Sequence, residues 1–162
     1  MDSRVFRQTV GQFVTGVTVI ATENDGAIHA MTANSFTSLS LEPPLVLLCV
    51  GKHTKMGALI REATRFSVNI LSRDQKSVSS YFAGAWKQGD PPTFLFEAWE
   101  GVPRLTGCAA TLACDVDAMH EGGDHWIVIG RVVSVDRSEP PVVPLVFFGG
   151  RYVGLEEAVA SA

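Results

Sequence analysis

The sequence has few charged residues and no concentration of positive charge. Lys, Arg, Asp and Glu make up 19% of its 162 residues, and the formal net charge at pH 7 is −4. Proteins that bind nucleic acid usually carry a basic patch or stripe. The composition therefore argues against nucleic acid as the main partner.

The sequence also lacks a long apolar run and a convincing leader. No stretch approaches the roughly 20 apolar residues that cross a membrane. The N-terminal segment holds Asp2, Arg4 and Arg7, and Thr and Gly interrupt its apolar part, which makes it a poor signal peptide. We therefore expect a soluble, cytoplasmic protein with no membrane partner.

Cysteine is scarce, with only Cys49, Cys108 and Cys114. An odd number at wide spacing fits neither a disulfide framework nor a zinc site. Cys108 and Cys114 are expected to share one strand, in which six residues separate them by about 20 Å, too far for a bridge. We expect three buried, reduced thiols and no metal.

A dinucleotide-binding signature is absent as well. No G-x-G-x-x-G opens a helix after a strand, and strands and helices do not alternate regularly, so a Rossmann fold is not expected. Instead, six or more β segments are mostly linked by hairpin turns such as NDG and EGGD. This pattern predicts an antiparallel β-barrel decorated by short helices, in a single domain over residues 1–162.

Helical signals are few and short. A helix is expected over residues 3–14, with Asp2 or Ser3 as its N-cap, and another runs from the Thr54 cap to Arg61. A third follows residues 72–74, and a loop rich in Gly, Pro and Trp covers residues 85–101. Because 46% of the residues are hydrophobic and a small domain has a limited interior, we expect a homodimer.

The stretch MTANSFTSLSLEPPLVLL, from Met31 to Leu48, joins uncharged polar side chains to a buried strand. Its segment TANSFTSLS carries six side-chain hydrogen-bonding groups and no ionisable group. Small donors of this kind suit a flat, neutral ligand with many acceptors, such as a flavin. A Ser- and Thr-rich strand that faces solvent is the alternative interpretation.

Four segments, TGVTVIAT, MTANSFTSLSLEPPLVLL, GGDHWIVIGRV and FFGGRYVGL, occur in an order and spacing that resembles the flavin reductase family. The resemblance runs from about Phe6 to Leu155. It implies a mainly β fold with short helices: an antiparallel Greek-key split β-barrel of the FMN-binding type. It also implies that FMN or FAD binds across a dimer and accepts a hydride from NADH or NADPH.

The resemblance further implies a set of site residues. Those implied to bind the flavin are Ala30, Met31, Thr32, Ala33, Asn34, Ser35, Cys49, Val50, Gly51, Thr54, Lys55, Phe82 and Tyr152. Cys49, Val50 and Gly51 match backbone contacts. A hydroxyl from Thr54, the charge of Lys55 and the N–H groups that open a helix match the phosphate site.

His125, in GGDH, is implied as the catalytic residue on the nicotinamide side, where it positions the carboxamide or pyrophosphate. If Gly122 and Gly123 formed a two-residue turn, His120 would lie opposite His125. For Phe82 and Tyr152, which the resemblance implies as flavin contacts, packing in the core is the alternative interpretation.

The expected activity is therefore an NAD(P)H-dependent flavin reductase that passes reduced flavin to a separate oxygenase. Three alternatives stay open: a non-catalytic flavin-binding protein, an enzyme of the pyridoxamine-phosphate-oxidase type, and a barrel with no ligand. The second expects more Lys and Arg than the 13 present. NADH is favoured over NADPH because the sequence has no obvious Arg cluster that could bind the 2′-phosphate of NADPH. The sequence does not distinguish FMN from FAD.

Overall fold

The computed structural model describes residues 1–155, and residues 156–162 of the expected domain lie outside the described residues. The helices are α1 (Ser3–Val10), α2 (Lys55–Leu59) and α3 (Lys76–Phe82), with a 3₁₀ turn at Arg73–Gln75. The strands are β1 (Thr15–Gly16), β2 (Thr18–Asn24), β3 (Ala27–Ala33), β4 (Phe36–Leu41), β5 (Pro44–Gly51), β6 (Arg65–Ile70), β7 (Phe96–Trp99), β8 (Val102–Leu105), β9 (Ala110–Gly122), β10 (His125–Arg137), β11 (Val146–Phe148) and β12 (Arg151–Val153).

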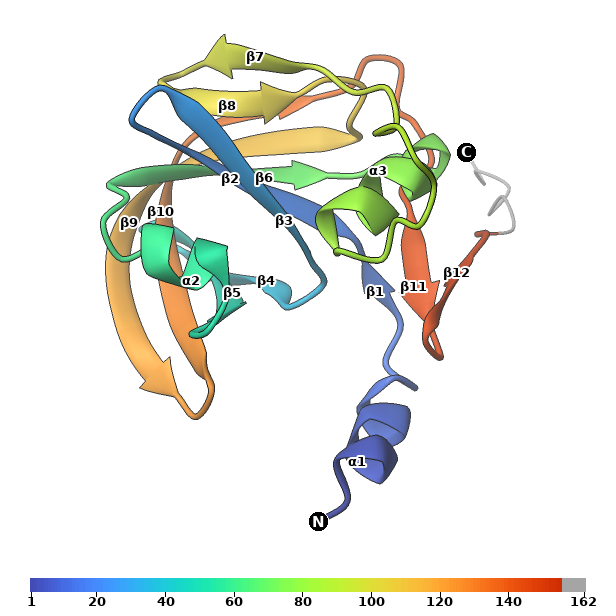
Figure 1. Ribbon diagram of the computed structural model, residues 1–162. Helices are drawn as coiled ribbons and strands as arrows, with labels where there is room; N and C mark the ends of the chain where they lie inside the picture. Colours follow the sequence, from blue (N-terminus) through green and yellow to red (C-terminus); the bar gives the residue numbers. More distant parts are fainter. Residues whose placement is uncertain (156–162) are drawn as a thin grey trace.

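Seven strands form one antiparallel sheet in the order β3-β2-β6-β9-β10-β5-β4. Its two edge strands, β3 and β4, are consecutive in the chain and only Asn34 and Ser35 separate them. The sheet must therefore curl until its edges meet at these two residues (Figure 1). The result is the expected split barrel, and we call residues 32–36 its seam.

The Greek-key feature lies in the connection from β5 to β6. These strands are consecutive, yet they flank the β9–β10 hairpin on opposite sides, and the chain between them contains α2. The β1-β11-β12 sheet and the β7–β8 hairpin stand outside the seven-stranded sheet (Figure 1).

The core has two layers because β2 is buried on both faces. Ile20 belongs to the layer inside the barrel, with Leu48, Phe66 and other residues of the curled sheet. Val19 belongs to a second layer outside it, which contains residues before and within α3 together with β8 and the C-terminal segment. The second layer fixes α3 and the β11–β12 hairpin beside the end of β3.

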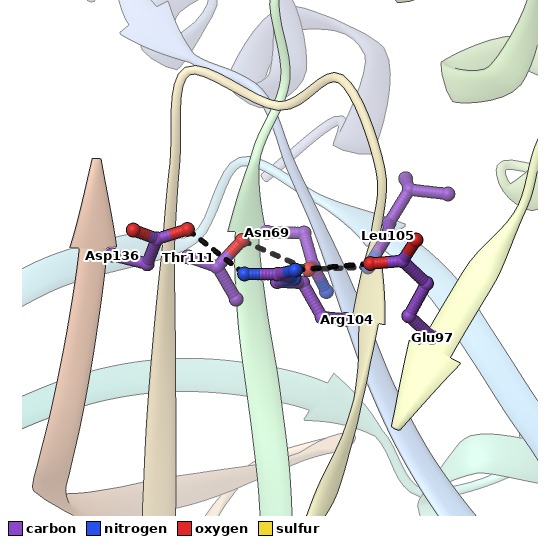
Figure 2. Close-up of polar contacts among 6 residues, drawn as sticks. All are labelled: Asn69, Glu97, Arg104, Leu105, Thr111 and Asp136. Atoms are coloured by element: carbon purple, nitrogen blue, oxygen red, sulfur yellow. Dashed lines mark hydrogen bonds and ion pairs between the residues drawn. The ribbon is translucent and has the colours of Figure 1, made fainter. Parts of the chain in front are cut away.

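One row of side chains crosses the sheet from the seam toward the β7–β8 hairpin. Cross-strand pairing places Thr32 opposite Val19, Val19 opposite Asn69, Asn69 opposite Thr111, and Thr111 opposite Asp136. Directly opposed residues share one face of a sheet. The row therefore connects the seam to the polar contacts drawn in Figure 2.

Asn69 anchors the middle of this row. Its Oδ1 accepts from the Leu105 N–H at 2.9 Å and from the Thr111 hydroxyl at 3.3 Å. Nearby, the Arg104 guanidinium lies between Glu97, at 2.9 Å, and Asp136, at 3.0 Å (Figure 2). These contacts tie β6, β7, β8 and β10 together.

The N-terminal helix is shorter than expected. It has Asp2 as its N-cap, with the carboxylate accepting from the Arg4 and Val5 N–H groups, and it ends at Val10 rather than at residue 14. Gly11 follows as the C-cap, which agrees with the low helix propensity of glycine. The first helix thus leaves Phe13 and Val14 in the connection to β1.

Three other details differ from the sequence-based expectations. Cys108 precedes β9, so it does not share a strand with Cys114, although all three cysteines are free and these two are buried. The expected loop over residues 85–101 contains β7. The β9–β10 turn is formed by Gly123 and Asp124, and His120 consequently lies opposite Ile127 rather than His125. None of the helices in residues 1–155 is long and apolar enough to cross a membrane.

Candidate functional site

The seam is built by hydrogen bonds that use small hydroxyl side chains. Buried Thr18 donates to the Ala33 carbonyl at 2.7 Å, which holds the end of β3. Thr32 donates to the Ser79 carbonyl at 2.7 Å and so fastens α3 to the same strand. Hydroxyl groups at the end of β3 therefore hold neighbouring parts of the protein together.

Within residues 1–155, the edge of β5 beyond Leu48 has no strand partner on the β4 side, because β4 begins at Phe36 opposite Leu48. The Ser35 hydroxyl takes the place of a strand: it donates to the Cys49 carbonyl and accepts from the Cys49 N–H, both at 3.1 Å. Backbone groups two residues apart in a strand point to the same side. The Gly51 N–H is therefore directed to this open edge.

Two more donors lie within the seam itself. Among the residues the structure describes, no hydrogen bond uses the backbone N–H of Asn34 or Ser35. The Asn34 amide donates to the Thr15 hydroxyl at 3.3 Å, which leaves its second N–H available. The seam thus offers neutral donors and no ionised group.

A pocket of about 160 Å³ opens beside the seam. Four of its residues, Thr32, Ala33, Asn34 and Tyr152, are among the expected flavin-binding residues. The pocket is also lined by Val17, Ser79, Ala83 and Phe147, which the sequence reasoning missed. Ser79 and Ala83 are one turn apart in and after α3, a spacing that signals a shared helix face.

A second hollow of about 330 Å³ continues from this pocket, since both are lined by Val17 and Asn34. Its other walls include Phe13 and Phe36. Asn34 therefore borders both hollows, whose walls include the apolar residues Val17, Phe36 and Phe147.

Tyr152 and Phe82 take different roles. The Tyr152 hydroxyl lies 2.8 Å from the Ser79 hydroxyl, and its ring packs edge-on against Phe147, with centroids 5.4 Å apart. Tyr152 therefore forms a wall of the pocket. Phe82 instead packs among Phe94 and Phe96, with ring centroids 5.0 and 5.9 Å away, and it does not line the pocket.

The expected phosphate site lies where β5 leads into α2. Thr54 caps α2: its hydroxyl accepts from the Gly57 N–H at 2.9 Å and donates to the Gly51 carbonyl at 2.8 Å. The hydroxyl proton is thus already used within the protein. Because α2 has only five residues, an anion here would depend mainly on lysine side chains: Lys55 is exposed, whereas the nearby Lys52 lies 3.4 Å from the Glu121 carboxylate.

His125 begins β10 directly opposite Gly51. Its Nδ1 lies 2.7 Å from Oδ1 of Asp124, and a carboxylate can only accept, so Nδ1 carries the proton. This hydrogen bond, followed by the attraction of the ring's charge, lowers the pKa of Asp124. A Cβ added at Gly51 would lie 3.8 Å from Nε2 of His125, so Nε2 faces the end of β5.

The remaining expected residues differ in what they can present to a ligand. The Val50 side chain is fully buried in the barrel, so only its backbone is available. Met31 packs against the inner core layer and Ala30 against the outer one. These two residues therefore pack β3 against the core on its two opposite faces.

The structure therefore gathers the expected residues into two neighbouring groups. Thr32, Ala33, Asn34 and Tyr152 form the pocket, whereas Ser35, Cys49, Gly51, Thr54 and His125 gather around the end of β5. Asn34 and Ser35 are adjacent, so the seam joins the two groups. No group of three or more potential metal-ligating side chains occurs in residues 1–155.

The chemistry of the site fits a flavin. The ring carbonyls and nitrogens of a flavin need neutral donors, which the N–H groups of Asn34, Ser35 and Gly51 provide. Its apolar end needs walls such as Phe147 and Val17, and its phosphate needs a cation such as Lys55. The fold and this site together define a flavin-binding split-barrel protein.

Comparison with known proteins places the chain in a family. Residues 10–156 match the model of the flavin reductase like domain, and the chain belongs to that family. It is 41% identical over 162 residues to the flavin-dependent monooxygenase reductase subunit HsaB of Rhodococcus jostii, covering 96% of this chain and 80% of the relative. It is 42% identical to an NADH-dependent flavin reductase of a Rhodococcus species, covering 93% and 85%.

Solved structures agree with this assignment. The flavin reductase PheA2 in its native state superposes with a TM-score of 0.91 at 43% identity, covering 97% of this chain and all of the other. The recognised motifs and the split-barrel expectation are thereby confirmed.

Proposed function

We propose that this protein is an NADH-dependent flavin reductase, which oxidises NADH and reduces FMN or FAD. The observation that carries the proposal is the seam, where neutral donors and the aromatic walls Phe147 and Tyr152 border one pocket in a chain of the flavin reductase like family. A relative named as an NADH-dependent flavin reductase supports NADH as the donor.

A bound flavin supplies the hydride acceptor, and the protein's own groups hold and orient the reactants. The N–H groups of Asn34, Ser35 and Gly51 would hold the flavin and would stabilise the negative charge of its reduced form. The Asp124 carboxylate holds the His125 ring with its proton on Nδ1, and we propose that Nε2 faces the nicotinamide of the co-substrate. His125 thus acts by positioning the co-substrate, and no general base is required.

The test is steady-state NADH oxidation with FMN, FAD and riboflavin compared side by side, and with NADPH as the second donor. Turnover with NADH and at least one flavin is expected. A protein that binds flavin without oxidising either nicotinamide would instead be the non-catalytic alternative, and one that binds no flavin would be a barrel without this ligand.

The role of Lys55 can be separated from the rest of the site by ligand choice. Lys55→Met should weaken binding of FMN several-fold, because the phosphate loses its cation. It should leave binding of riboflavin, which has no phosphate, unchanged. Equal effects on the two flavins would show that Lys55 supports the fold of the site rather than the phosphate.

His125→Ala should raise the KM for NADH more than it raises the Kd for flavin. This difference follows from the place of His125 opposite Gly51, at the outer end of the site. Kinetics identical to those of the unaltered protein would remove His125 from the site.

The site belongs, in our proposal, to a homodimer. The N-terminal helix α1 extends away from the sheet (Figure 1) and none of its residues is buried. Its exposed apolar residues, with those that follow it, are Val5, Phe6, Val10, Phe13 and Val14. Phe13 also lines the hollow beside Asn34, so a second copy that covers this arm would also enclose the flavin.

Sedimentation velocity is the test of the dimer. The unaltered chain should sediment as a dimer, and replacing Val10 and Phe13 with Ser should shift it toward the monomer and weaken flavin binding. A monomeric unaltered chain would contradict the proposal.

The product, reduced flavin, is proposed to pass to a separate oxygenase, as the name of the reductase subunit from Rhodococcus jostii suggests. The cytoplasm is the proposed location, since NADH is found there and its reducing conditions maintain free thiols such as the three present. One domain over residues 1–162 is proposed to carry the whole activity.

A further inference from the structure

A fully buried serine on α3 joins two walls of the pocket beside the seam. Ser79 has no exposed surface, and its hydroxyl lies 2.8 Å from the hydroxyl of Tyr152. Its backbone carbonyl accepts from the Thr32 hydroxyl at 2.7 Å. Ser79 therefore connects β3 with β12, and all three residues line the pocket.

The direction of the hydrogen bond between Ser79 and Tyr152 follows from the number of protons. A hydroxyl can donate or accept, so the two groups have two protons for one bond. Within the part of the chain that the structure describes, the Ser79 hydroxyl has no other partner, not even the helix carbonyl four residues earlier that such a hydroxyl often uses. Burial also keeps this hydroxyl from bulk water. Because a buried donor without an acceptor is costly, Ser79 donates and Tyr152 accepts.

The phenol proton of Tyr152 is then available to another acceptor. Among residues 1–155, the Tyr152 hydroxyl has a hydrogen bond only with Ser79. The ring is fixed by its neighbours, since Phe147 packs against it with centroids 5.4 Å apart and the Lys76 ammonium lies 5.6 Å from its centre. A fixed ring with an unused donor in the wall of a pocket is suited to hold an acceptor there.

We propose that Ser79 is a positioning residue: its hydroxyl directs the phenol proton of Tyr152 into the pocket, where Tyr152 donates a hydrogen bond to a carbonyl oxygen of the redox ligand. This inference rests on the proposed function, because it assumes that the pocket receives such a carbonyl. A flavin ring carbonyl and the carboxamide of nicotinamide are both neutral acceptors, so the chemistry is the same for each.

A double-mutant cycle of Ser79→Ala and Tyr152→Phe tests the proposal. The readouts are the flavin Kd from calorimetric titration and the KM for NADH. Tyr152→Phe removes one neutral hydrogen bond to the ligand, so the value for that ligand should rise about fivefold. Ser79→Ala should raise the same value about twofold or more, because the phenol is no longer held in one orientation. A rise in flavin Kd identifies the flavin as the acceptor, whereas a rise in KM at unchanged Kd identifies the nicotinamide.

The decisive observation is the coupling between the two substitutions. Because Ser79 acts through Tyr152, Ser79→Ala should have no further effect on either value once Tyr152→Phe is present. Ser80→Ala is the matched control: it makes the same chemical change one residue further along α3, outside the lining of the pocket, and should leave both values unaltered. Additive effects of Ser79→Ala and Tyr152→Phe, or an equal effect of Ser80→Ala, would overturn the proposal, since a general loosening of α3 would then explain them.

The direction of the hydrogen bond can be tested without any ligand. In Tyr152→Phe the buried Ser79 hydroxyl loses its acceptor, so adding Ser79→Ala should recover part of the Tm that Tyr152→Phe has lost. A further fall in Tm would mean that the Ser79 hydroxyl has another acceptor, and the assigned direction would be wrong.

These measurements also separate the inference from the proposed function. Coupled changes in flavin Kd would support the positioning role of Ser79 even if the unaltered protein failed to oxidise NADH. Turnover with NADH and flavin, together with unchanged Kd and KM in both variants, would uphold the reductase and overturn this inference.

Discussion

Asn69→Leu is expected to destabilise the protein by removing hydrogen bonds with little change in packing volume. Asn69 is fully buried. Its amide donates to the Val19 carbonyl at 3.0 Å and to the Ser67 hydroxyl at 2.9 Å, and its oxygen accepts from Leu105 and Thr111 (Figure 2). Leucine has a similar size but can neither donate nor accept, so the substitution isolates the polar contribution.

The magnitude follows from the groups left without a partner. The N–H of buried Leu105 loses its bond to Asn69, and an unsatisfied buried donor costs about 1–3 kcal/mol. The Val19 carbonyl loses a further bond worth about 1 kcal/mol. The expected loss of unfolding free energy is therefore about 3 kcal/mol, which for a domain of this size lowers the Tm by about 6–12 °C.

Differential scanning calorimetry at one fixed protein concentration measures this effect, because association would make Tm depend on concentration. Thr111→Val is the matched control: it removes only the 3.3 Å contact to Asn69 and should cost less than about 1 kcal/mol. If Asn69→Leu lowered the Tm by less than about 2 °C, or if Thr111→Val lowered it equally, the hydrogen bonds of Asn69 would not make the proposed contribution to stability.

Three further outcomes are expected elsewhere in the molecule. Burial raises the pKa of Cys108 and of Cys114 to about 12, so iodoacetamide at pH 8 should label neither thiol until the protein is denatured, and mass spectrometry would detect any exception. Gly130→Ala would bring its Cβ to 2.5 Å from a buried phenylalanine ring on β6 and should cost about 1–3 kcal/mol, whereas Gly16→Ala, with open space around it, should leave Tm nearly unchanged. The neighbouring imidazole lowers the folded-state pKa of Asp124, so any stability that this carboxylate contributes is present above the usual Asp range near pH 4 and is lost as pH falls through the lower folded value. Asp124→Asn should therefore match the unaltered protein in Tm at strongly acid pH and fall below it at neutral pH; a difference independent of pH would contradict this.

The hairpins could be predicted from the sequence because their turns have local chemical requirements. Asp25 and Gly26 both have positive φ, as do Gly149 and Gly150, and such pairs form the tight turns that suit twisted strands. The turn of β9 and β10 was misplaced by one residue because Gly122, Gly123 and Asp124 all suit a turn. A shift of one residue changes every cross-strand pair, and this is why His120 lies opposite Ile127 and not opposite His125, where a Gly122–Gly123 turn would have placed it.

The sequence could predict only those pocket residues that lie in one short segment of the chain. Thr32, Ala33 and Asn34 are consecutive, so one motif identifies all three. Ser79 enters the site because α3 docks on β3, through a hydrogen bond that spans 47 positions in the chain. Phe147 is placed by the β1–β11 pairing. Contacts of this kind depend on the packing of the outer core layer, which no local pattern in the sequence encodes.

The position of the site follows from the topology of the sheet. A closed barrel has no free edge, and an open sheet exposes two. Here the two edges are joined by Asn34 and Ser35, so they must approach each other closely at that one point. The N–H groups that a neighbouring strand would otherwise use, at Asn34, Ser35 and Gly51, are left at the junction. A flat ligand rich in acceptors could satisfy them without charge. TANSFTSLS has no carboxylate, and a carboxylate there would compete with such a ligand for the same donors.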